Sequence, residues 1–161
     1  KLLSRPIYSY ALGVLAFWLA MDQWTSKGAQ GMPQPLADAS ELVRYGWIAL
    51  RVLSGVVATP IAEELAFRGY LLRRFIYAEF ENVTDYRSVP LPPLAYGLIG
   101  SSLIFGVLHG THWIAGSLAG AVYGLTMLRR GRIGEAILAH AVTNAGLAAI
   151  ALVWNRWDLW G

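Results

Sequence analysis

Residues 60–74 read PIAEELAFRGYLLRR and place two adjacent glutamates inside an otherwise apolar run. Side chains four residues apart share one face of a helix, so Glu64 and Arg68 are spaced to form an ion pair. Glu63 points about 100° away from that face. The stretch therefore predicts a helix that carries one structural ion pair and one acid that remains available for another partner.

The composition of the surrounding chain indicates that this helix lies in a lipid bilayer. Of the 161 residues, 56% are hydrophobic and 14% are charged, whereas about a quarter of the residues in a soluble domain are charged. The net charge of +3 is too small to suggest a nucleic-acid partner. The absence of cysteine excludes disulfides, thiolate catalysis and cysteine-based zinc sites. We expect a single integral membrane domain over residues 1–161, trimmed of helices that precede Lys1.

Hydrophobic segments predict an all-α, polytopic bundle of about five transmembrane helices. The second segment would be about 60 Å long as one helix, so Pro60 is the expected place for a bend or break. Residues 88–128 contain no Asp, Glu, Lys or Arg, which is enough for two passes joined by a turn near Gly110 to His112. A polar loop is predicted at residues 25–40, and the helices are predicted at residues 6–21, 41–80, two within 88–128, and 136–155.

Two patterns predict how the helices pack and which way they cross the membrane. Gly116, Gly120 and Gly124 form a stripe of small residues at four-residue spacing, which lets helix backbones approach closely. Arginine-rich loops are typical of the cytoplasmic side, and counting passes from them gives alternating sides without contradiction. The segments predicted to be cytoplasmic are residues 73–74 and 129–132.

Three polar side chains lie inside the uncharged runs. His109 follows Phe105 by four residues and Asn144 follows His140 by four, so each pair shares one helix face. At the rise of an α-helix, these groups and Glu63 lie about 12 to 20 Å from the cytoplasmic ends of their helices. The polar groups of three helices are therefore expected to converge near the bilayer midplane.

Such a convergence favours a hydrolytic site. Ionisable groups at this depth are costly and are rarely present without a partner or a water-filled cavity. Glu63 and His109 would draw a proton from water, and the N–H groups of His140 and Asn144 would face a developing oxyanion. His112, at the turn, is interpreted as an interfacial residue.

Other interpretations of the same residues remain open. Glu63 alone would be explained by a buried hydrogen bond, and either intramembrane histidine alone by packing. A metal-dependent hydrolase could hold one divalent ion with two Glu, two His and an Asn, although no His-Glu-x-x-His pair is present. A non-catalytic membrane scaffold or immunity protein would bind a peptide in the same cavity. Asp22 is interpreted as an ordinary helix-end charge.

Three motifs occur in order within residues 51–153: Glu63-Glu64-x-x-x-Arg68, Phe105-x-x-x-His109 and His140-x-x-x-Asn144. In order, spacing and residue type they resemble those of the CPBP, or ABI, intramembrane proteases, which include the type II CAAX prenyl endopeptidases and the Ras-converting protease group. By this resemblance we interpret residues 51–153 as a protease core.

The resemblance implies a glutamate-dependent endopeptidase that acts on a membrane-associated protein or peptide, prenylated or not. It assigns water activation to Glu63 and His109, and the oxyanion hole to His140 and Asn144. The ion pair described above would order the site, and neither a metal nor another cofactor would be required. Residues 51–53 and 68–73 resemble the bacterial, exosortase-associated branch, which implies a location in the bacterial plasma membrane.

Overall fold

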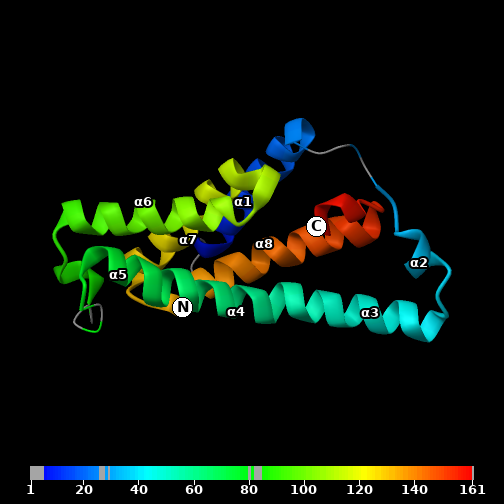
Figure 1. Cartoon of the computed structure of the whole chain (residues 1–161), viewed down its shortest axis with the longest axis horizontal. Helices are drawn as coiled ribbons and strands as arrows, with labels where there is room; N and C mark the ends of the chain where they lie inside the picture. The colour runs from blue at the N-terminus through cyan, green and yellow to red at the C-terminus, as the bar shows by residue number, and fades with distance from the viewer. Residues whose placement is uncertain (1–5, 26–27, 29, 80, 82–84, 161) are drawn as a thin grey trace.

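The computed structural model describes residues 6–25, 28, 30–79, 81 and 85–160, and within these ranges it contains helices and no strand (Figure 1). The predicted all-α helical bundle is therefore confirmed. The elements are α1 (Pro6–Thr25), α2 (Gln34–Ala37), α3 (Glu41–Leu53), η1 (Ser54–Ala58), α4 (Thr59–Glu64), η2 (Leu65–Leu71), α5 (Leu72–Ile76), η4 (Tyr86–Ser88), α6 (Leu91–Val107), η5 (Gly110–His112), α7 (Trp113–Arg130), α8 (Ile133–Val153) and η6 (Trp157–Trp160).

The elements from α3 to α5 follow one another without a break, from Glu41 to Ile76. The expected break at Pro60 is therefore wrong. The segments η1 and η2 are π-helical, and the Thr59 N–H donates to the Ser54 carbonyl, five residues back, directly before the proline. This wider turn lets the helix continue past a residue that donates no backbone hydrogen bond. The helix ends at Ile76, because Tyr77 is extended, and Phe80 lies outside the described residues.

The remaining helices follow the predicted order. The uncharged run forms α6 and α7, joined by η5 where the turn was expected, and α8 begins three residues earlier than predicted. The polar loop after α1 contains the short helix α2. Two helical segments are long and apolar enough to cross a membrane, Glu41–Ile76 and Ile133–Val153, and the apolar helix Leu91–Val107 is shorter.

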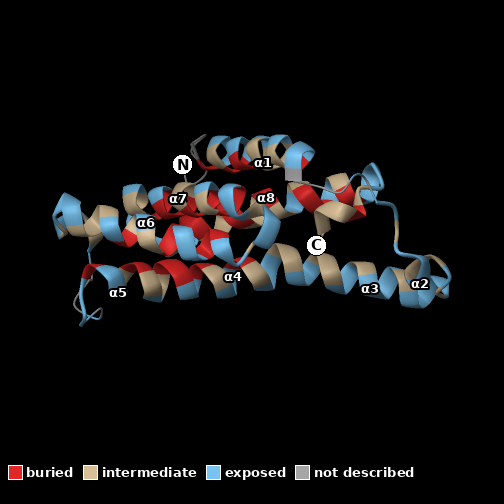
Figure 2. Ribbon diagram, turned by 45° about the horizontal axis from the view of Figure 1, so that its top comes forward, coloured by how far each residue is buried: buried red, intermediate tan, exposed pale blue. Residues whose placement is uncertain are grey.

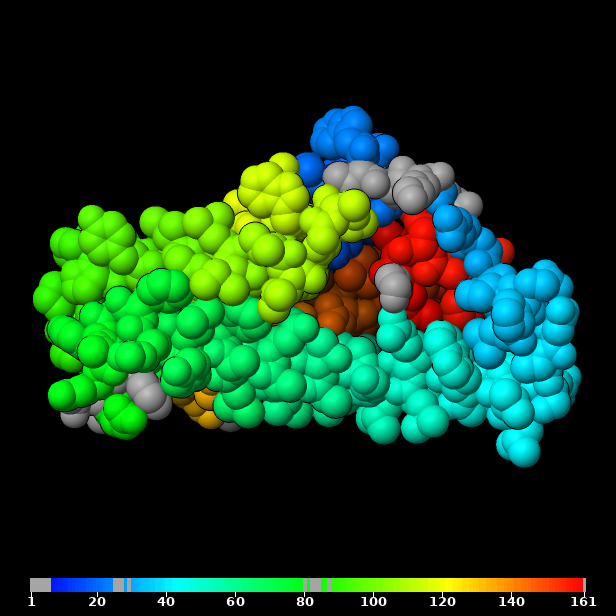
Figure 3. Space-filling view, viewed as in Figure 1, coloured from blue at the N-terminus to red at the C-terminus, as the bar shows by residue number. Residues whose placement is uncertain are grey.

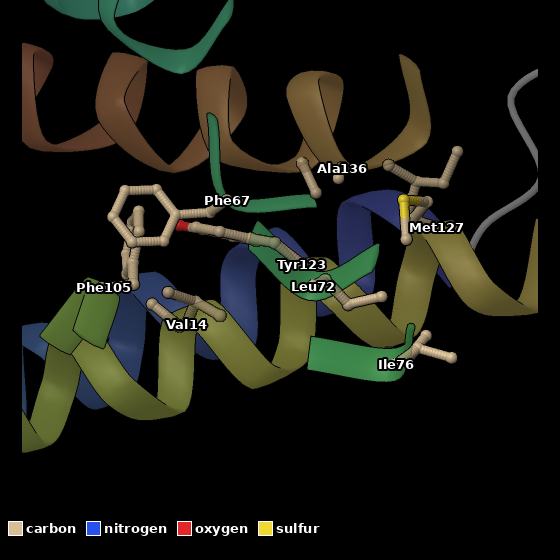
Figure 4. Close-up of a cluster of buried hydrophobic side chains, with 11 residues drawn as sticks. Val14, Phe67, Leu72, Ile76, Phe105, Tyr123, Met127 and Ala136 are labelled. Carbon is tan, nitrogen blue, oxygen red and sulfur yellow. The ribbon is translucent and has the colours of Figure 1, made fainter. Parts of the chain in front are cut away.

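The glycine stripe of α7 packs against α6, as the spacing predicts. A Cβ atom on Gly116 would lie 3.0 Å from the Cα of Gly106, and one on Gly120 would lie 3.2 Å from the Cα of Ser102. Buried residues gather where α4 and α5 meet α6, α7 and α8, whereas α3 has none (Figure 2). The core cluster in Figure 4 contains Phe105 and Tyr123 and therefore adjoins the motif residues.

The segment after α8 folds back onto the chain around a buried acid. Asp22, interpreted above as an ordinary helix-end charge, is only 2% exposed. It accepts a hydrogen bond from Arg156, and its Oδ1 lies 3.1 Å from His112 Nε2. Arg156 also donates to Asp158, which accepts from the backbone N–H of Gln30 at 3.0 Å. The earlier interpretation of Asp22 is therefore corrected, because the acid connects α1 to η5 and to the segment that leads into η6.

We expect Asp158→Asn to lower the melting temperature in detergent by about 2–4 °C at pH 7, the shift that corresponds to roughly 1 kcal/mol for a chain of this size. Hydrogen bonds from Arg156 hold the pKa of Asp158 below its usual range. The ionised form is therefore favoured by folding, and this stabilisation is present above the unfolded-state pKa of about 3.9 and lost as the pH falls through the lower folded-state pKa. The difference in melting temperature between wild type and variant should be smaller at pH 3 than at pH 7. An equal difference at both values would contradict this assignment, and Asp38→Asn is the exposed control.

Candidate active site

The innermost polar contact of the bundle joins two residues of the long helix. Arg68 Nε lies 3.1 Å from Glu64 Oε2, and Arg68 Nη1 donates to Glu64 Oε1 at 3.3 Å. Both side chains are fully buried. The spacing of four residues therefore produces the predicted ion pair, and the guanidinium contacts both carboxylate oxygens.

The rest of the guanidinium is accommodated by α6 and α7. Arg68 Nη2 donates to the Gly120 carbonyl at 2.6 Å, and the guanidinium carbon lies 4.6 Å from the centre of the Phe105 ring. A Cβ atom on Gly120 would lie 2.9 Å from Arg68 Nη2. The glycine stripe, which the sequence indicates only as a packing feature, therefore also makes room for the buried cation.

His140 lies between the two adjacent glutamates. Its Nδ1 lies 3.0 Å from Glu64 Oε1 and its Nε2 lies 3.9 Å from Glu63 Oε2. Because the ionised carboxylate of Glu64 only accepts hydrogen bonds, Nδ1 is the donor. In the neutral ring Nε2 is then an acceptor, and it donates only when the ring is an imidazolium. Tyr123 stacks on the ring with 4.8 Å between centroids.

Glu63 is the more accessible of the two acids. Its side chain is 33% exposed, while that of Glu64 is fully buried. Its Oε2 atom is buried without a hydrogen-bond partner among the described residues. The structure therefore separates the glutamates as the helical spacing predicts, because Glu64 is bound in an ion pair and Glu63 is partly exposed and lines two cavities.

The ring of His109 is oriented by the end of α6. The backbone N–H of His109 donates to the Gly106 carbonyl, three residues back, so the Phe105 carbonyl does not receive it. His109 Nδ1 lies 2.7 Å from that Phe105 carbonyl oxygen. A carbonyl oxygen only accepts, so Nδ1 is the donor, and Nε2 of the neutral ring carries a lone pair. His109 is therefore held in the tautomer that can accept a proton through Nε2.

Asn144 is oriented by a backbone carbonyl of the π-helical segment η1. Its Nδ2 donates to the Gly55 carbonyl at 2.8 Å. The backbone donor four residues after Gly55 is Thr59, whose N–H bonds to Ser54 instead, and the donor five residues after it would be Pro60, which has no N–H. The π turn and the proline together leave the Gly55 carbonyl to the amide of Asn144.

These side chains line two neighbouring cavities of the bundle. An inner cavity of about 130 Å³ is lined by Glu63, His109, His140 and Asn144, and it has room for several water molecules. An outer cavity of about 740 Å³ shares Glu63, His109 and Asn144 with it. The structure therefore brings together all four residues proposed as catalytic, while Glu64 and Arg68 lie behind them.

Several residues around the inner cavity were missed by the sequence analysis. Tyr123 stacks on His140, and its position three residues after Gly120 places it on the face of the glycine stripe, a signal that could have identified it. Trp18 of α1 lies 5.5 Å from the His109 ring and stacks on His112 at 5.4 Å. No spacing relates α1 to the motifs, so the position of Trp18 could not be predicted. Thr143 also lines the cavity.

No group of three or more His, Cys, Asp or Glu side chains that could hold a metal ion occurs within the described ranges. Glu64 is directed to Arg68 and His140, and Glu63 approaches one nitrogen of His140 at 3.9 Å. The ionisable side chains of these four residues therefore contact mainly one another.

We expect Arg68→Met to destabilise the protein by about 3–5 kcal/mol, because it leaves the Glu64 carboxylate buried without its cation. Unfolding by heat or denaturant in detergent micelles measures the change. The double variant Glu64→Gln with Arg68→Met should recover most of the loss, since it removes the unpaired charge and keeps an acceptor for His140. Arg74→Met, at an exposed position, is the matched control. An Arg68→Met protein as stable as wild type would show that the pair is not structural.

Comparison with protein families identifies the chain. The family model for "Type II CAAX prenyl endopeptidase Rce1-like" matches residues 45–146, more than half of the sequence and all three motifs. Neither the curated proteins nor the solved structures give a match. The exosortase-associated branch is not distinguished by this match and stays a prediction. The chain therefore belongs to the Rce1-like family of type II CAAX prenyl endopeptidases, which are integral membrane proteases that act on membrane-associated proteins.

Proposed function

We propose that the chain is a metal-independent glutamic endopeptidase in which Glu63 and His109 activate the hydrolytic water. The observation that carries this proposal is the inner cavity, which both side chains line. The Glu63 side chain is 33% exposed, and the hydrogen bond of His109 Nδ1 to Phe105 leaves Nε2 as an acceptor. Two acceptors around one water molecule favour its deprotonation.

In the first step, the water oxygen attacks the carbonyl carbon of the scissile peptide bond. One water proton passes to the Glu63 carboxylate, while His109 Nε2 accepts a hydrogen bond from the other O–H and orients the molecule. The product of this step is a tetrahedral intermediate with a negative oxygen. In the second step the C–N bond breaks, and Glu63 returns its proton to the leaving amine, so the enzyme regains its starting protonation state.

The oxyanion is stabilised by Asn144 and His140 in this proposal. One N–H of the Asn144 amide is bound to the Gly55 carbonyl, which leaves the second N–H for the oxyanion. His140 donates from Nε2 in its imidazolium form, with the Glu64 carboxylate on its Nδ1 side. The Glu64–Arg68 ion pair acts through His140 as a positioning pair, because it holds the ring and does not reach the cavity.

The substrate class follows from the family and the bilayer. We propose a membrane-associated protein or peptide, with cleavage near a C-terminal signal or a prenylated cysteine. In this proposal Glu63 and His109 activate the water without a metal ion, so chelators are expected to leave the activity unchanged.

We expect Glu63→Gln and His109→Ala each to lower peptide hydrolysis by at least about 100-fold, the usual contribution of a positioned acid or base. The assay uses purified protein in proteoliposomes and internally quenched peptides, with and without a prenylated cysteine. Glu135→Gln is the matched control, since Glu135 is a buried glutamate at the start of α8 and lines neither cavity.

Three outcomes would contradict the proposal. Equal activity of wild type, Glu63→Gln and His109→Ala would reject the assigned residues. Loss of activity in EDTA, restored by zinc, would favour a metal-dependent hydrolase. A wild-type protein that binds peptides without turnover, with binding unchanged by Glu63→Gln, would favour a scaffold or immunity protein.

We expect Pro60→Ala to reduce kcat by about tenfold or more while KM changes little. Alanine at this position supplies a backbone N–H that competes for the Gly55 carbonyl, and the Asn144 amide then loses its anchor. Removal of one oxyanion donor lowers kcat by about 100- to 1000-fold, so a displaced Asn144 amide should lower kcat by less. Thermal stability should stay constant or rise, because alanine is about 3 kcal/mol more favourable than proline within a helix.

Pro93→Ala, in the first turn of α6, is the matched control for this substitution, because its position is far from η1 in the chain and it lines neither cavity. A Pro60→Ala protein with wild-type kcat would show that the Gly55 carbonyl does not position Asn144 for the reaction.

A further inference from the structure

Trp18 of α1 packs against both histidines of the turn between α6 and α7. Its indole ring lies 5.5 Å from the His109 ring, with 76° between the two planes. The same indole stacks on the His112 ring, with 5.4 Å between centroids and 7° between planes. Trp18 also lines the inner and the outer cavity. It therefore forms part of the cavity wall next to the imidazole that is proposed to orient the water.

The His109 ring is enclosed by three helices. The Phe105 ring of α6 lies 4.6 Å away, and a Cβ atom on Gly116 of α7 would lie 3.0 Å from His109 Cγ. The hydrogen bond of Nδ1 to the Phe105 carbonyl fixes one atom of the ring. The direction of Nε2, on the opposite side of the ring, then depends on how the ring is packed, and α1 contributes to this packing through Trp18.

The indole of Trp18 is in turn supported by His112 and a buried acid. Trp18 and Asp22 are four residues apart, so they share one face of α1. Asp22 Oδ1 lies 3.1 Å from His112 Nε2, and because a carboxylate only accepts, Nε2 is the donor. The Thr111 hydroxyl lies 3.3 Å from His112 Nδ1, where it donates to the neutral ring. Both nitrogens of His112 therefore have partners, and its ring is fixed against the indole.

The C-terminal segment holds the acid from the other side. Asp22 accepts from Arg156, which also donates to Asp158. In the space-filling view, blue atoms of α1 lie between the yellow-green segment around η5 and the red C-terminal segment (Figure 3). Trp18, Asp22 and Arg156 all lie outside residues 45–146, which the family model matches. The support behind His109 therefore comes from parts of the chain that the family match does not include.

We infer that Trp18 is a positioning residue for His109, held in place by His112 and Asp22. The indole keeps the imidazole from turning its Nε2 away from the water that Glu63 deprotonates. Reacting groups must be held close to the productive geometry, and a displacement of about 1 Å lowers the rate by up to about 100-fold. The effect on the reaction rests on the protease function proposed above, whereas the order of the His109 ring does not depend on it.

We expect Trp18→Ala to lower kcat for the quenched peptides by about 10- to 100-fold with little change in KM, because a displaced imidazole affects the reaction more than binding. Trp18→Phe keeps an aromatic ring against both histidines and should recover most of this loss. Trp24→Ala is the matched control, since Trp24 is an exposed tryptophan of the same helix and lines neither cavity.

A double variant tests whether Trp18 acts through His109. In a His109→Ala protein, Trp18→Ala should cause no further loss of kcat, because two residues that act through one group are not additive. Independent, multiplying losses would overturn the inference. A higher KM with unchanged kcat in Trp18→Ala would overturn it as well, and would assign the indole to substrate binding instead.

The order of the His109 ring can be measured without any turnover. The chain has three histidines, so histidine labelled with ¹⁵N in the ring gives three sets of NMR signals, which single His→Ala variants assign. In Trp18→Ala, the Nδ1 proton of His109 should exchange with water about tenfold faster or more, because a hydrogen bond slows exchange only while it is closed. The Nδ1 proton of His140, which is bound to Glu64, is the internal control and should not change.

Each outcome of these measurements decides one of the two proposals. Unchanged exchange at His109 in Trp18→Ala would overturn the positioning role of the indole. If Trp18→Ala does not fold, His112→Ala removes the ring that supports the indole and should change kcat and exchange in the same direction, by smaller factors. If wild type and Glu63→Gln hydrolyse the peptides equally, or not at all, the protease function fails, while the exchange at His109 still shows whether Trp18 holds its ring.

Discussion

The ion pair between Arg68 and Glu64 is the contact on which the rest of the site depends. Two charges in an apolar interior are tolerated only if nearly every polar atom has a partner, and here the partners come from the other helices. The guanidinium uses both carboxylate oxygens, the Gly120 carbonyl and the face of Phe105, and the carboxylate also accepts from His140. Satisfying this pair therefore brings α4, α6, α7 and α8 to one point. The inner cavity lies next to that point.

Backbone carbonyls that helices leave without a backbone donor orient the other polar side chains. The Phe105 carbonyl, at the end of α6, accepts from the His109 ring, and the Gly55 carbonyl, in the π turn before Pro60, accepts from Asn144. The second π-helical segment behaves in the same way: the Leu72 N–H bonds to Phe67, five residues back, and the Arg68 carbonyl accepts from the hydroxyl of Tyr86. Irregular helix geometry thus supplies rigid acceptors where side chains must be aimed, since an unpaired carbonyl in a protein interior is costly.

The sequence predicted those parts of this arrangement that depend on spacing along one helix. Four-residue intervals identified the Glu64–Arg68 pair and the faces of His109 and Asn144, and uncharged runs located the helices and the turn at residues 110–112. The continuity of the helix through Pro60 could not be predicted, because the carbonyl that the π turn leaves without a backbone donor is satisfied by Asn144 of another helix. Contacts between distant segments also explain two other differences. The glycine stripe was interpreted only as a packing feature, although Gly120 accepts a hydrogen bond from Arg68, and the burial of Asp22 beside Arg156 was missed. Contacts between distant segments have no periodic signal in a single sequence.

The outer cavity restricts the backbone conformation of any substrate that reaches Glu63 and His109. A peptide in α-helical form keeps its carbonyls in intrachain hydrogen bonds, so a scissile bond must first unwind, and unwound backbone is not tolerated in contact with lipid. The polar lining of the outer cavity, with Arg51, Thr59 and Asp158 among its residues, and the water it admits offer the exposed amides new partners. Cleavage would then favour sequences whose helical order is already weak near the membrane surface, so that glycine, proline or a helix terminus in the substrate, more than any particular side chain, would mark the position of the cut.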